Sequence, residues 1–395
     1  MFLVCEPIAW GMEHVPFNAA LLRTICLAFP NDKVSFYAEN DHAKFVQEQL
    51  GEELEAAIIW RELALPARHS KFFSRLSSDF RIVKFLLKKL ESDPKKDVLV
   101  VTGNASILWA LKYYTRSVHK NKKVQVVIHG NFSTLTRIPR REILNPLYYV
   151  GSLKTALKLP GYQRLQHIVL EESVRNKVLE SLPFLKNHIY VLDHPIPVDK
   201  NHEINEAIVD PKMDLPIEFG YLGRATKQKG FFRYLEAAAE ISKKFPGQTK
   251  FHYIGRVPEK LRQRDISKMA NLTEIANKER MSRNEYVNRL KSLHFVCLFY
   301  DRYYEFCASG VLMDSIAWGK PIIATQLPIF KTIQQRFGDI GYLCGNNEFS
   351  KTINSIIQTN DADRYKRQVL NMSHVKASRT PETLAMKYLE LVNCL

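Results

Sequence analysis

Two basic residues lie close together in one short turn of the sequence, within "FGYLGRATKQKGFFRYLEAAAEI" (residues 219–241). Arg224 follows a glycine that ends an apolar, strand-like run, and Lys229 precedes the glycine at which a helical pattern begins. An arginine can donate two parallel hydrogen bonds to phosphate oxygens, whereas a lysine acts as a point charge. Such a pair is most often solvated surface, so it predicts a diphosphate site only where further anion-binding groups converge on it.

Ser309 and Gly310 could supply those further groups. They follow the apolar run "HFVCLFY" (residues 294–300) and precede a helical pattern. Serine is a common helix cap, and glycine lets a ligand approach the backbone. A helix N-terminus carries free N–H groups and a partial positive charge, which match an anion. Two cations and a helix N-terminus in one cleft therefore predict a diphosphate site.

The first half of the chain offers candidates of the same kind, directly after predicted strands. They are Gly11 and His14 after the first strand, Asn104 after "DVLVV" and His129 after "VQVVI". His129 either takes part in chemistry or only caps a loop or helix. His14 either contacts an acceptor or caps the first helix. The residues alone leave both alternatives open.

Strands and helices alternate along the chain at the rhythm of a parallel, doubly wound sheet. The alternation stops over residues 196–217, which are polar, contain prolines and have no period, so we place an interdomain linker there. We expect an α/β protein of two tandem doubly wound, Rossmann-like domains that face a cleft. The first spans residues 1–198 and the second residues 199–380, and a helix over residues 381–395 packs back on the first. In such sheets ligands bind beyond the carboxyl ends of the strands, where the strand order reverses.

The composition is that of a folded protein, with 46% hydrophobic and 25% charged residues among 395. No apolar run reaches the ~18 residues that a membrane-spanning helix needs. The start of the chain lacks the pattern of a secretory signal. The six cysteines are scattered without a CxxC pair. They argue against a zinc site or disulfides, favour a reducing cytoplasm, and are mostly expected in the core.

The formal net charge of +16 is unevenly spread. Residues 101–170 hold eleven Lys and Arg residues against one acid, Glu142, a net of +10. This charge favours nucleic acid, a phospholipid surface or phosphorylated substrates as partners, although a merely solubilising surface would look the same. Neither a GxxxxGK[ST] nor a GxGxxG motif occurs, which disfavours P-loop NTPases and dinucleotide enzymes. The Asp-x-Asp pair of Asp361 and Asp363 follows no strand, so we interpret it as solvated surface and expect no metal and no cofactor.

The order and spacing of several segments resemble the family-4 retaining glycosyltransferases of the GT-B fold. "GYLGRATKQKGFFRYLEAAAEI" resembles that family's strand–GR–KG–helix segment, and "FHYIG" resembles its next strand. "SGVLMDSIAWGKPIIAT" resembles the helix and strand that carry its second acidic residue. "VVIHGN", "HIVLEES" and "YVLDHPIP" resemble its His-Gly turn and its last strands before the linker. The resemblance covers most of the chain and is strongest over residues 219–325.

The resemblance implies a sugar transferase that uses a nucleotide-diphosphate sugar. We expect it to need no metal, because two cations stand where a metal-dependent enzyme would place acids. The donor-binding residues that the resemblance implies are Gly223, Arg224, Lys229, Ser309, Gly310 and Asp314. Among them, Arg224 and Lys229 would bind the diphosphate and Asp314 the ribose. His129 would approach the donor sugar near the reacting carbon, so it joins the two cations as a catalytic candidate. Gly11, His14 and Asn104 are expected on the acceptor side.

The chain departs from this family at one acidic position. The family usually has two glutamates separated by seven residues. Counting back from Asp314, the first acidic position is Phe306, and the nearest acid is Glu305. Either Glu305 makes the contacts of the family's first acid from a shifted loop, or a different contact replaces those of the first acid.

Two segments combine basic residues with aromatic ones. The helix predicted around residues 71–89 carries six Lys and Arg residues with several phenylalanines, and residues 137–164 carry basic residues with tyrosines. Basic amphipathic helices with aromatics can lie in a membrane interface, although most such helices simply pack on a sheet. We favour a peripheral contact with an anionic membrane, at roughly 1 kcal/mol per basic residue near the leaflet.

These observations together predict a cytoplasmic glycosyltransferase, peripheral on the inner face of the plasma membrane. It would move a sugar onto a glycan or lipid-linked acceptor in polysaccharide, lipopolysaccharide or capsule assembly. The alternative is a basic protein that binds anionic lipid or RNA without chemistry. RNA binders usually show aromatic stacking strips or a known module, and neither is present, so we expect no nucleic-acid partner.

Overall fold

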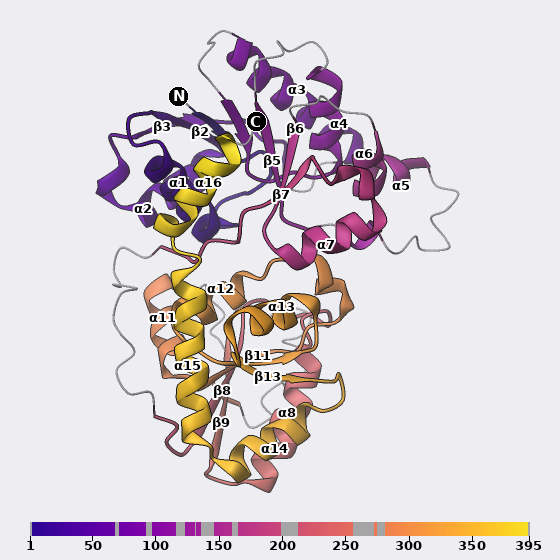
Figure 1. Ribbon diagram of the computed structural model, residues 1–395. Helices are drawn as coiled ribbons and strands as arrows, with labels where there is room; N and C mark the ends of the chain where they lie inside the picture. The colour runs from indigo at the N-terminus through magenta and orange to yellow at the C-terminus, as the bar shows by residue number, and fades with distance from the viewer. Residues whose placement is uncertain are drawn as a thin grey trace. The chain divides into compact units, whose positions relative to one another are not determined.

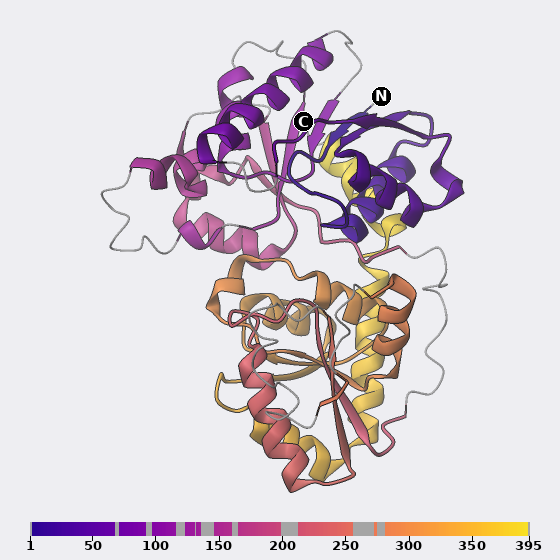
Figure 2. The same cartoon turned by 180° about the vertical axis from the view of Figure 1, so that it is seen from behind.

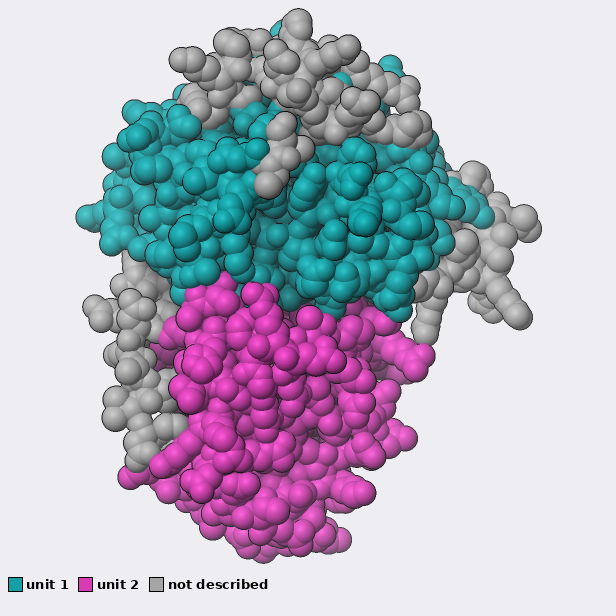
Figure 3. Space-filling view, in the orientation of Figure 1, with its two compact units in different colours: residues 1–200, 306–308, 379–395 teal, residues 201–305, 309–378 magenta. Residues whose placement is uncertain are grey.

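The computed structural model describes residues 2–67, 71–91, 97–115, 123–130, 132–135, 146–159, 165–198, 212–255, 272–274 and 281–393. The chain divides into two compact units, which Figure 3 shows in different colours. Unit 1 comprises residues 1–200, 306–308 and 379–395, and unit 2 comprises residues 201–305 and 309–378. Each unit contains a parallel sheet of its own.

Unit 1 has a seven-stranded sheet with helices on both faces (Figures 1 and 2). Its strands are β1 Phe2–Cys5, β2 Val34–Ala38, β3 Ile58–Glu62, β4 Asp97–Val100, β5 Val124–Ile128, β6 Leu165–Val169 and β7 Ile189–Val191. Its described α-helices are α1 Val15–Ala28, α2 Asn40–Leu50, α3 Phe72–Glu91, α4 Ala105–Tyr114, α5 Pro146–Gly151, α6 Leu153–Lys158, α7 Glu172–Ser181 and α16 Pro381–Asn393. Short 3-10 turns lie at Glu52–Leu54, Phe132–Leu135 and Pro183–Leu185.

The strand order of unit 1 is β3-β2-β1-β4-β5-β6-β7, and neighbouring strands run parallel. The order reverses at β1, which lies between β2 and β4. Phe2 of β1 is opposite Val34 of β2 on one side and Asp97 of β4 on the other. Loops that follow β1 and β4 therefore leave the sheet side by side at its carboxyl edge.

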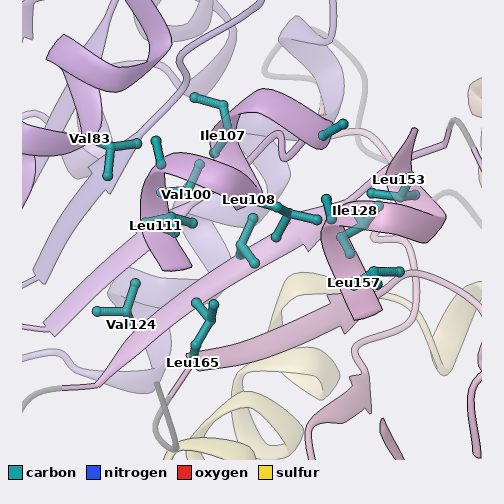
Figure 4. Packing of buried hydrophobic residues seen from close by; sticks show 14 of the residues in the cluster. Val83, Val100, Ile107, Leu108, Leu111, Val124, Ile128, Leu153, Leu157 and Leu165 are labelled. Atoms are coloured by element: carbon teal, nitrogen blue, oxygen red, sulfur yellow. The ribbon is translucent and has the colours of Figure 1, made fainter. Parts of the chain in front are cut away.

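Alternate residues of β1 enter two different cores of unit 1. Phe2 and Val4 belong to the core that includes α1, α2 and α16, whereas Leu3 and Cys5 belong to the core that includes α3, α4 and α6. Figure 4 shows the second core, where helix residues such as Leu108 pack over the strands. Burial on both faces explains why the strands appear in the sequence as nearly continuous apolar runs.

Helix α16 belongs to unit 1, although the helix before it lies in unit 2. It begins at Pro381, as the sequence predicts, and buries Leu384 and Tyr388 in the core shared with α1. Just before it, Arg379 donates to both carboxylate oxygens of Glu171 at 2.8 Å. Both side chains are buried, so this bidentate pair fixes the place where the chain re-enters unit 1.

Unit 2 has a six-stranded sheet with helices on both faces (Figures 1 and 2). Its strands are β8 Ile217–Leu222, β9 Thr249–Ile254, β10 Leu272–Glu274, β11 Phe295–Leu298, β12 Ile322–Thr325 and β13 Gly341–Cys344. Its described α-helices are α8 Phe231–Lys244, α11 Arg283–Ser292, α12 Gly310–Ala317, α13 Pro328–Phe337, α14 Phe349–Thr359 and α15 Ala362–Ala377. A 3-10 turn, Arg302–Phe306, follows β11.

The strand order of unit 2 is β10-β9-β8-β11-β12-β13, again with parallel neighbours. The order reverses at β8, between β9 and β11. Phe219 of β8 stacks on Phe251 of β9 and Phe295 of β11, with ring centroids 5.1 and 5.7 Å apart. These rings form the centre of a core that α8, α14 and α15 complete.

The two doubly wound sheets confirm the fold class that the sequence predicts. The helix expected after Gly255, most of the linker over residues 196–217 and much of residues 137–164 lie outside the described residues. Within the described ranges, no helix is both long and apolar enough to cross a bilayer.

Candidate active site

The candidate residues follow strands on either side of the two reversal points. In unit 2, the turn with Arg224 and Lys229 follows β8, and the segment that leads into α12 follows β11. In unit 1, the Gly11 loop follows β1, Asn104 follows β4 and His129 follows β5, the strand beside β4. These are the places where doubly wound sheets bind ligands. The residues form two groups, one in each unit.

The turn of residues 223–230 is tightly constrained by its glycines. Gly223 has φ +85° and its carbonyl accepts a hydrogen bond from the Tyr253 hydroxyl at 3.1 Å. Gly230 has φ +74°, and a Cβ at this position would lie 1.9 Å from the carbonyl oxygen of Phe299. The Lys229 N–H donates to Thr226 Oγ1 at 3.2 Å. The turn is thus held against the end of β11, which fixes the direction in which Lys229 leaves it.

The Lys229 side chain lies beside Gly223 and the first turn of α12. A Cβ built on Gly223 would be 3.6 Å from Lys229 Nζ and 3.4 Å from Val311 Cγ2. Lys229 Nζ also lies 5.9 Å from the ring centroid of Tyr304. The end of β8, a cation and the start of a helix therefore meet within unit 2.

Ser309 caps helix α12, as its sequence context predicts. Its Oγ accepts the N–H of Leu312 at 3.2 Å and lies 2.8 Å from the hydroxyl of the buried Tyr300. Gly310 is exposed, and a Cβ there would have no atom within 4 Å. The start of α12 is therefore open at Gly310, where no side chain fills the space beside the backbone.

Arg224 lies at the other end of the turn, and its side chain is exposed. Its backbone carbonyl accepts a hydrogen bond from the Tyr221 hydroxyl at 3.3 Å. Within the part of the chain that the structure describes, no ion pair holds its guanidinium. The group is therefore available to an anionic ligand, although no contact with Lys229 is seen.

Asp314 lies in the second turn of α12 and is engaged by α11. Its Oδ1 accepts from Arg283 Nη2 at 2.9 Å, and its Oδ2 accepts from the Tyr286 hydroxyl at 2.9 Å. Its side chain is 13% exposed. Burial, together with the negative charge of Asp314, raises the pKa of Tyr286 well above its usual value, so the phenol stays a donor. Arg283 and Tyr286 therefore fix the direction of the carboxylate that the family resemblance assigns to the ribose.

Glu305 and Phe306 stand side by side in the 3-10 turn after β11 but in different surroundings. Phe306 is 2% exposed, belongs to the core of unit 1 and packs near the ring of Phe132, with centroids 6.5 Å apart. An apolar side chain buried in this way offers nothing to a sugar hydroxyl. Glu305 is half-buried and is the acid available in this turn.

His129 lies at the end of β5 in unit 1, close to His14 and Phe17. Its Nε2 is 2.8 Å from the carbonyl oxygen of Val101, so this nitrogen carries the proton. The His14 ring stacks on it with centroids 5.0 Å apart, and the Phe17 ring lies nearly perpendicular to it with centroids 4.1 Å apart. Burial, together with the nearby His14 and His194, lowers the pKa of His129 well below its ordinary value. The imidazole is neutral at physiological pH, with Nδ1 as its acceptor.

The other acceptor-side candidates have unequal surroundings. His14 is exposed and occupies the position before α1 with φ +57°, but its side chain makes no cap hydrogen bond. Gly11 has φ +52° and open space where a Cβ would lie. Asn104, in contrast, caps α4, because its Oδ1 accepts the N–H of Ile107 at 2.8 Å. The structure thus places His14 beside His129 and gives Asn104 a structural task.

Sequence reasoning did not find Thr226, Tyr300, Arg283 and Tyr286. Each acts through a partner that is distant in the chain or depends on the shape of a turn. The sequence gives weak signals at most, such as a threonine three residues before Lys229. The Asp-x-Asp pair proves to be a helix start, since Asp361 caps α15 by accepting the N–H of Arg364 at 2.8 Å.

Possible metal ligands and cysteine thiols can be located in the described parts of the chain. No group of three or more His, Cys, Asp or Glu side chains there is arranged to hold a metal ion. Cys5, Cys26, Cys297 and Cys344 are buried free thiols, as expected of core residues. Burial raises the pKa of Cys26 and of Cys344 to about 11, so neither is a reactive thiolate at neutral pH.

Comparison with known proteins agrees with this architecture. A family model described as glycosyl transferases group 1 matches residues 206–371. No curated protein matches the chain in sequence.

Solved structures share the fold over almost the whole chain. One described as "Trehalose-6-phosphate from E. coli bound with UDP-2-fluoro glucose" has a TM-score of 0.65 at 12% identity, covering 100% of this chain and 99% of that chain. WaaG, described as a glycosyltransferase involved in lipopolysaccharide biosynthesis, has a TM-score of 0.68 at 11% identity and 99% coverage of both chains. A glycosyltransferase from Rickettsia africae has a TM-score of 0.60 at 16% identity, covering 99% of this chain and 97% of that chain. At such identities the likeness establishes the fold.

The family match covers the segment that carries Arg224, Lys229, Ser309, Gly310 and Asp314. The resemblance noted in the sequence is confirmed. Residues 206–371 match the glycosyl transferases group 1 family, and the chain has the GT-B fold, as the resemblance to the family-4 retaining glycosyltransferases implies.

Proposed function

We propose that unit 2 binds the diphosphate of a nucleotide sugar between the turn after β8 and the N-terminus of α12. The sugar is then transferred, with retention, to a glycan or lipid-linked acceptor at the cytoplasmic face of a membrane. The assembly of a polysaccharide, lipopolysaccharide or capsule is the setting that fits best. The observation that carries the proposal is the meeting of Gly223, Lys229 and the first turn of α12 in unit 2.

Charge complementarity supports this assignment. A diphosphate carries negative charge that a cation and the positive end of a helix both stabilise. Lys229 and the open N-terminus at Gly310 supply these two features, and Arg224 adds a guanidinium that can bind two oxygens at once. As the bond to the sugar breaks, the leaving diphosphate gains charge, so the same groups stabilise the transition state more than the bound substrate.

The remaining donor contacts are assigned by position. Asp314, held by Arg283 and Tyr286, is proposed for the ribose, and Ser309 and Gly310 for backbone contacts with phosphate or sugar. Glu305 is proposed to replace the first acid of the family. Two of the similar structures contain UDP or a UDP-sugar according to their descriptions, which supports a uridine nucleotide as the first donor to test.

We propose that no metal is needed, because cations of the protein stand where a metal-dependent enzyme would place acids. His129 is proposed to approach the donor sugar as a neutral imidazole, while Gly11 and His14 serve the acceptor side together with Asn104. No general base is assigned, since in this family the leaving phosphate can help to take the acceptor proton.

Isothermal titration of UDP, GDP and ADP in the presence of EDTA tests the donor site. We expect at least one diphosphate to bind, and Arg224→Ala and Lys229→Ala each to weaken it by about 10- to 150-fold, from a charge-assisted hydrogen bond of about 1.5–3 kcal/mol. Lys243→Ala, in the exposed last turn of α8, is the matched control and should bind normally. Full affinity in both turn variants would show that the cations are surface charge. Binding that disappears with EDTA would contradict the metal-free proposal.

The membrane contact is proposed for helix α3. Its inner residues, such as Val83 and Leu87, are buried in the core of unit 1, so the helix packs on the sheet like an ordinary one. Its outer side nevertheless exposes Phe72, Phe73 and Phe85 beside several lysines. Exposed aromatics and basic groups together suit an anionic lipid surface better than water. A basic lipid-binding protein without chemistry remains the alternative, and it would bind vesicles but no nucleoside diphosphate.

A further inference from the structure

The loop between β1 and α1 carries Gly11 and His14 but has no regular secondary structure of its own. Such a loop needs other groups to hold its backbone polar atoms. In this protein the groups are side chains of unit 1 that are buried and polar. Glu6, Asn18, His42 and Thr102 are all 7% exposed or less.

Glu6 is the centre of this buried network. Its Oε1 accepts the N–H groups of Ile8 and Ala9 at 2.9 and 3.0 Å, which folds the first half of the loop. Its Oε2 accepts from the Thr102 hydroxyl at 2.6 Å and from Asn18 Nδ2 at 3.1 Å. One carboxylate therefore ties the loop to the end of β4 and to the first helix.

His42 continues the network to Gly11. Its Nδ1 is 2.6 Å from the Gly11 carbonyl oxygen, so Nδ1 carries the proton and donates to the loop. Its Nε2 is then an acceptor, which matches the Asn18 amide nitrogen at 2.8 Å. The Gly11 N–H donates to Glu39 Oε2 at 3.2 Å. Both backbone polar groups of Gly11 are therefore held by side chains at the start of α2.

The loop held in this way is strained and open at the same time. His14 has φ +57°, a conformation that costs a residue other than glycine about 1–2 kcal/mol. Gly11 has no atom within 4 Å of the place where a Cβ would be. Strain maintained by surrounding hydrogen bonds is a common property of functional sites.

We propose that Glu6 and His42 are positioning residues for the acceptor-side loop, and that they act on the acceptor through Gly11 and His14. The proposal rests on the acceptor-side role proposed above for these two residues. The hydrogen bond from His42 to the Gly11 carbonyl is the part of the network that can be removed most selectively. Its loss lets the loop leave the position in which His14 stacks on His129.

Two substitutions of His42 separate positioning from packing. His42→Asn places an amide N–H near the position of Nδ1 and keeps a donor for Gly11. His42→Gln places its amide near the position of Nε2, keeps the partner of Asn18 and loses the donor for Gly11. Both remove the same ring, so a general loss of stability affects them alike. Lys44→Ala, exposed on the same helix, is the neutral control.

The full-length protein is assayed with glucose and galactose donors of the nucleoside diphosphate that binds in the titration, and with octyl glycosides as acceptor probes. Donor hydrolysis is measured in parallel. Hydrogen exchange of a peptide covering residues 6–14 reports the loop directly. We expect His42→Gln to speed exchange in this peptide and to raise the acceptor KM about tenfold, the effect of one lost hydrogen bond, while the donor KM and hydrolysis stay near wild type. His42→Asn and Lys44→Ala should resemble the wild type in both readouts.

The outcomes separate this inference from the proposed function. If His42→Gln and His42→Asn behave alike in exchange and kinetics, the positioning inference is wrong. It is also wrong if His14→Ala raises the acceptor KM and His42→Gln does not. If His14→Ala leaves the acceptor KM unchanged, the acceptor-side role itself is wrong, whatever His42 does to the loop. Glu6→Gln, which keeps the shape but removes one acceptor oxygen, should repeat the effect of His42→Gln.

Discussion

Replacement of Gly230 by alanine tests whether the turn after β8 is built to aim Lys229. Two separate costs arise at this position. The φ of +74° costs a residue with a Cβ about 1–2 kcal/mol. In addition, the new Cβ would lie 1.9 Å from the Phe299 carbonyl oxygen, so the turn and the end of β11 must move apart. Such overpacking costs about 1–3 kcal/mol, which gives a total of about 2–5 kcal/mol.

Gly247 provides a matched control in the same unit. Its φ is +78°, almost the same as that of Gly230, but no atom lies within 4 Å of its Cβ position. Gly247→Ala therefore measures the cost of the backbone conformation alone, about 1–2 kcal/mol. At about 2–4 °C per kcal/mol for a unit of this size, it should lower the Tm of unit 2 by about 2–8 °C.

Differential scanning calorimetry and titration of a nucleoside diphosphate form the assay. We expect Gly230→Ala to lower the Tm clearly more than Gly247→Ala and to weaken diphosphate binding, because Lys229 moves with the turn. Gly247→Ala should bind normally. Equal Tm shifts for the two variants would refute the packing argument, and normal diphosphate affinity in a folded Gly230→Ala would refute the link between the turn and Lys229.

Three further predictions concern other parts of the molecule. Tyr286→Phe removes the hydrogen bond to Asp314 and should lower the affinity for a nucleoside diphosphate several-fold. The affinity for inorganic pyrophosphate, which has no ribose, should not change. Equal losses of affinity for both ligands would contradict the ribose assignment. Burial lowers the pKa of His167 and of His194 to about 3. As the pH falls, the unfolded chain, whose His pKa is near 6.5, therefore binds these two protons before the folded chain does. The contribution of these two residues to the free energy of unfolding should therefore be constant above about pH 7. Below about pH 6.5 it should fall by up to about 1.4 kcal/mol per pH unit and residue, which urea titrations at pH 5, 6 and 7 would measure. A His167→Gln variant with an unchanged pH slope would count against this explanation. Phe73→Ala, at a side chain that is 65% exposed, should reduce sedimentation with vesicles containing phosphatidylglycerol, and binding should weaken as salt rises; equal binding to neutral vesicles would exclude the electrostatic part.

The sequence predicted the fold class because its strands are buried on both faces. Runs such as "VQVVI" have no polar face. When such runs alternate with helices, few folds other than a parallel sheet bury the strands on both faces. The positions of Arg224 and Lys229 after β8, and the cap at Ser309, followed from the same alternation. Local signals were sufficient for these residues: a glycine at each end of the turn that carries the two cations, and a serine before a helix.

Other features depend on pairings that no local pattern contains. Asp314 is four residues into α12 and is bound by α11, whose separation in sequence is about thirty residues, so its partners could not be read from its own motif. Gly230 looks like an ordinary turn glycine, and its close approach to Phe299 arises only when β11 lies beside β8. The Glu6 network likewise requires β1, β4 and α2 to be in place before its polar atoms can meet.

Asn104 lies where the sequence predicts, but its side chain caps a helix. It follows β4 at the reversal point, as the alternation predicts, but its side chain is used by the N-terminus of α4. A helix that starts directly after a strand needs a cap, and the sequence offers Asn104 for it. The acceptor-side role of this residue stays a prediction.

The division of unit 1 into separate segments of the chain has a consequence for biosynthesis. Its first 200 residues leave the ribosome early, but Leu384 and Tyr388 of α16 belong to the same core as Phe2 and Leu22. The residues between these two segments of unit 1 form unit 2, except for residues 306–308, which belong to unit 1. Unit 1 thus starts to fold first and cannot finish until residues 381–393 emerge. The apolar face beside α1 that these residues cover therefore stays exposed during the synthesis of unit 2. A nascent chain paused within unit 2 should therefore recruit chaperones to this face, which Leu384 and Tyr388 cover only after α16 has emerged. The Arg379–Glu171 pair then holds the segment directly before α16.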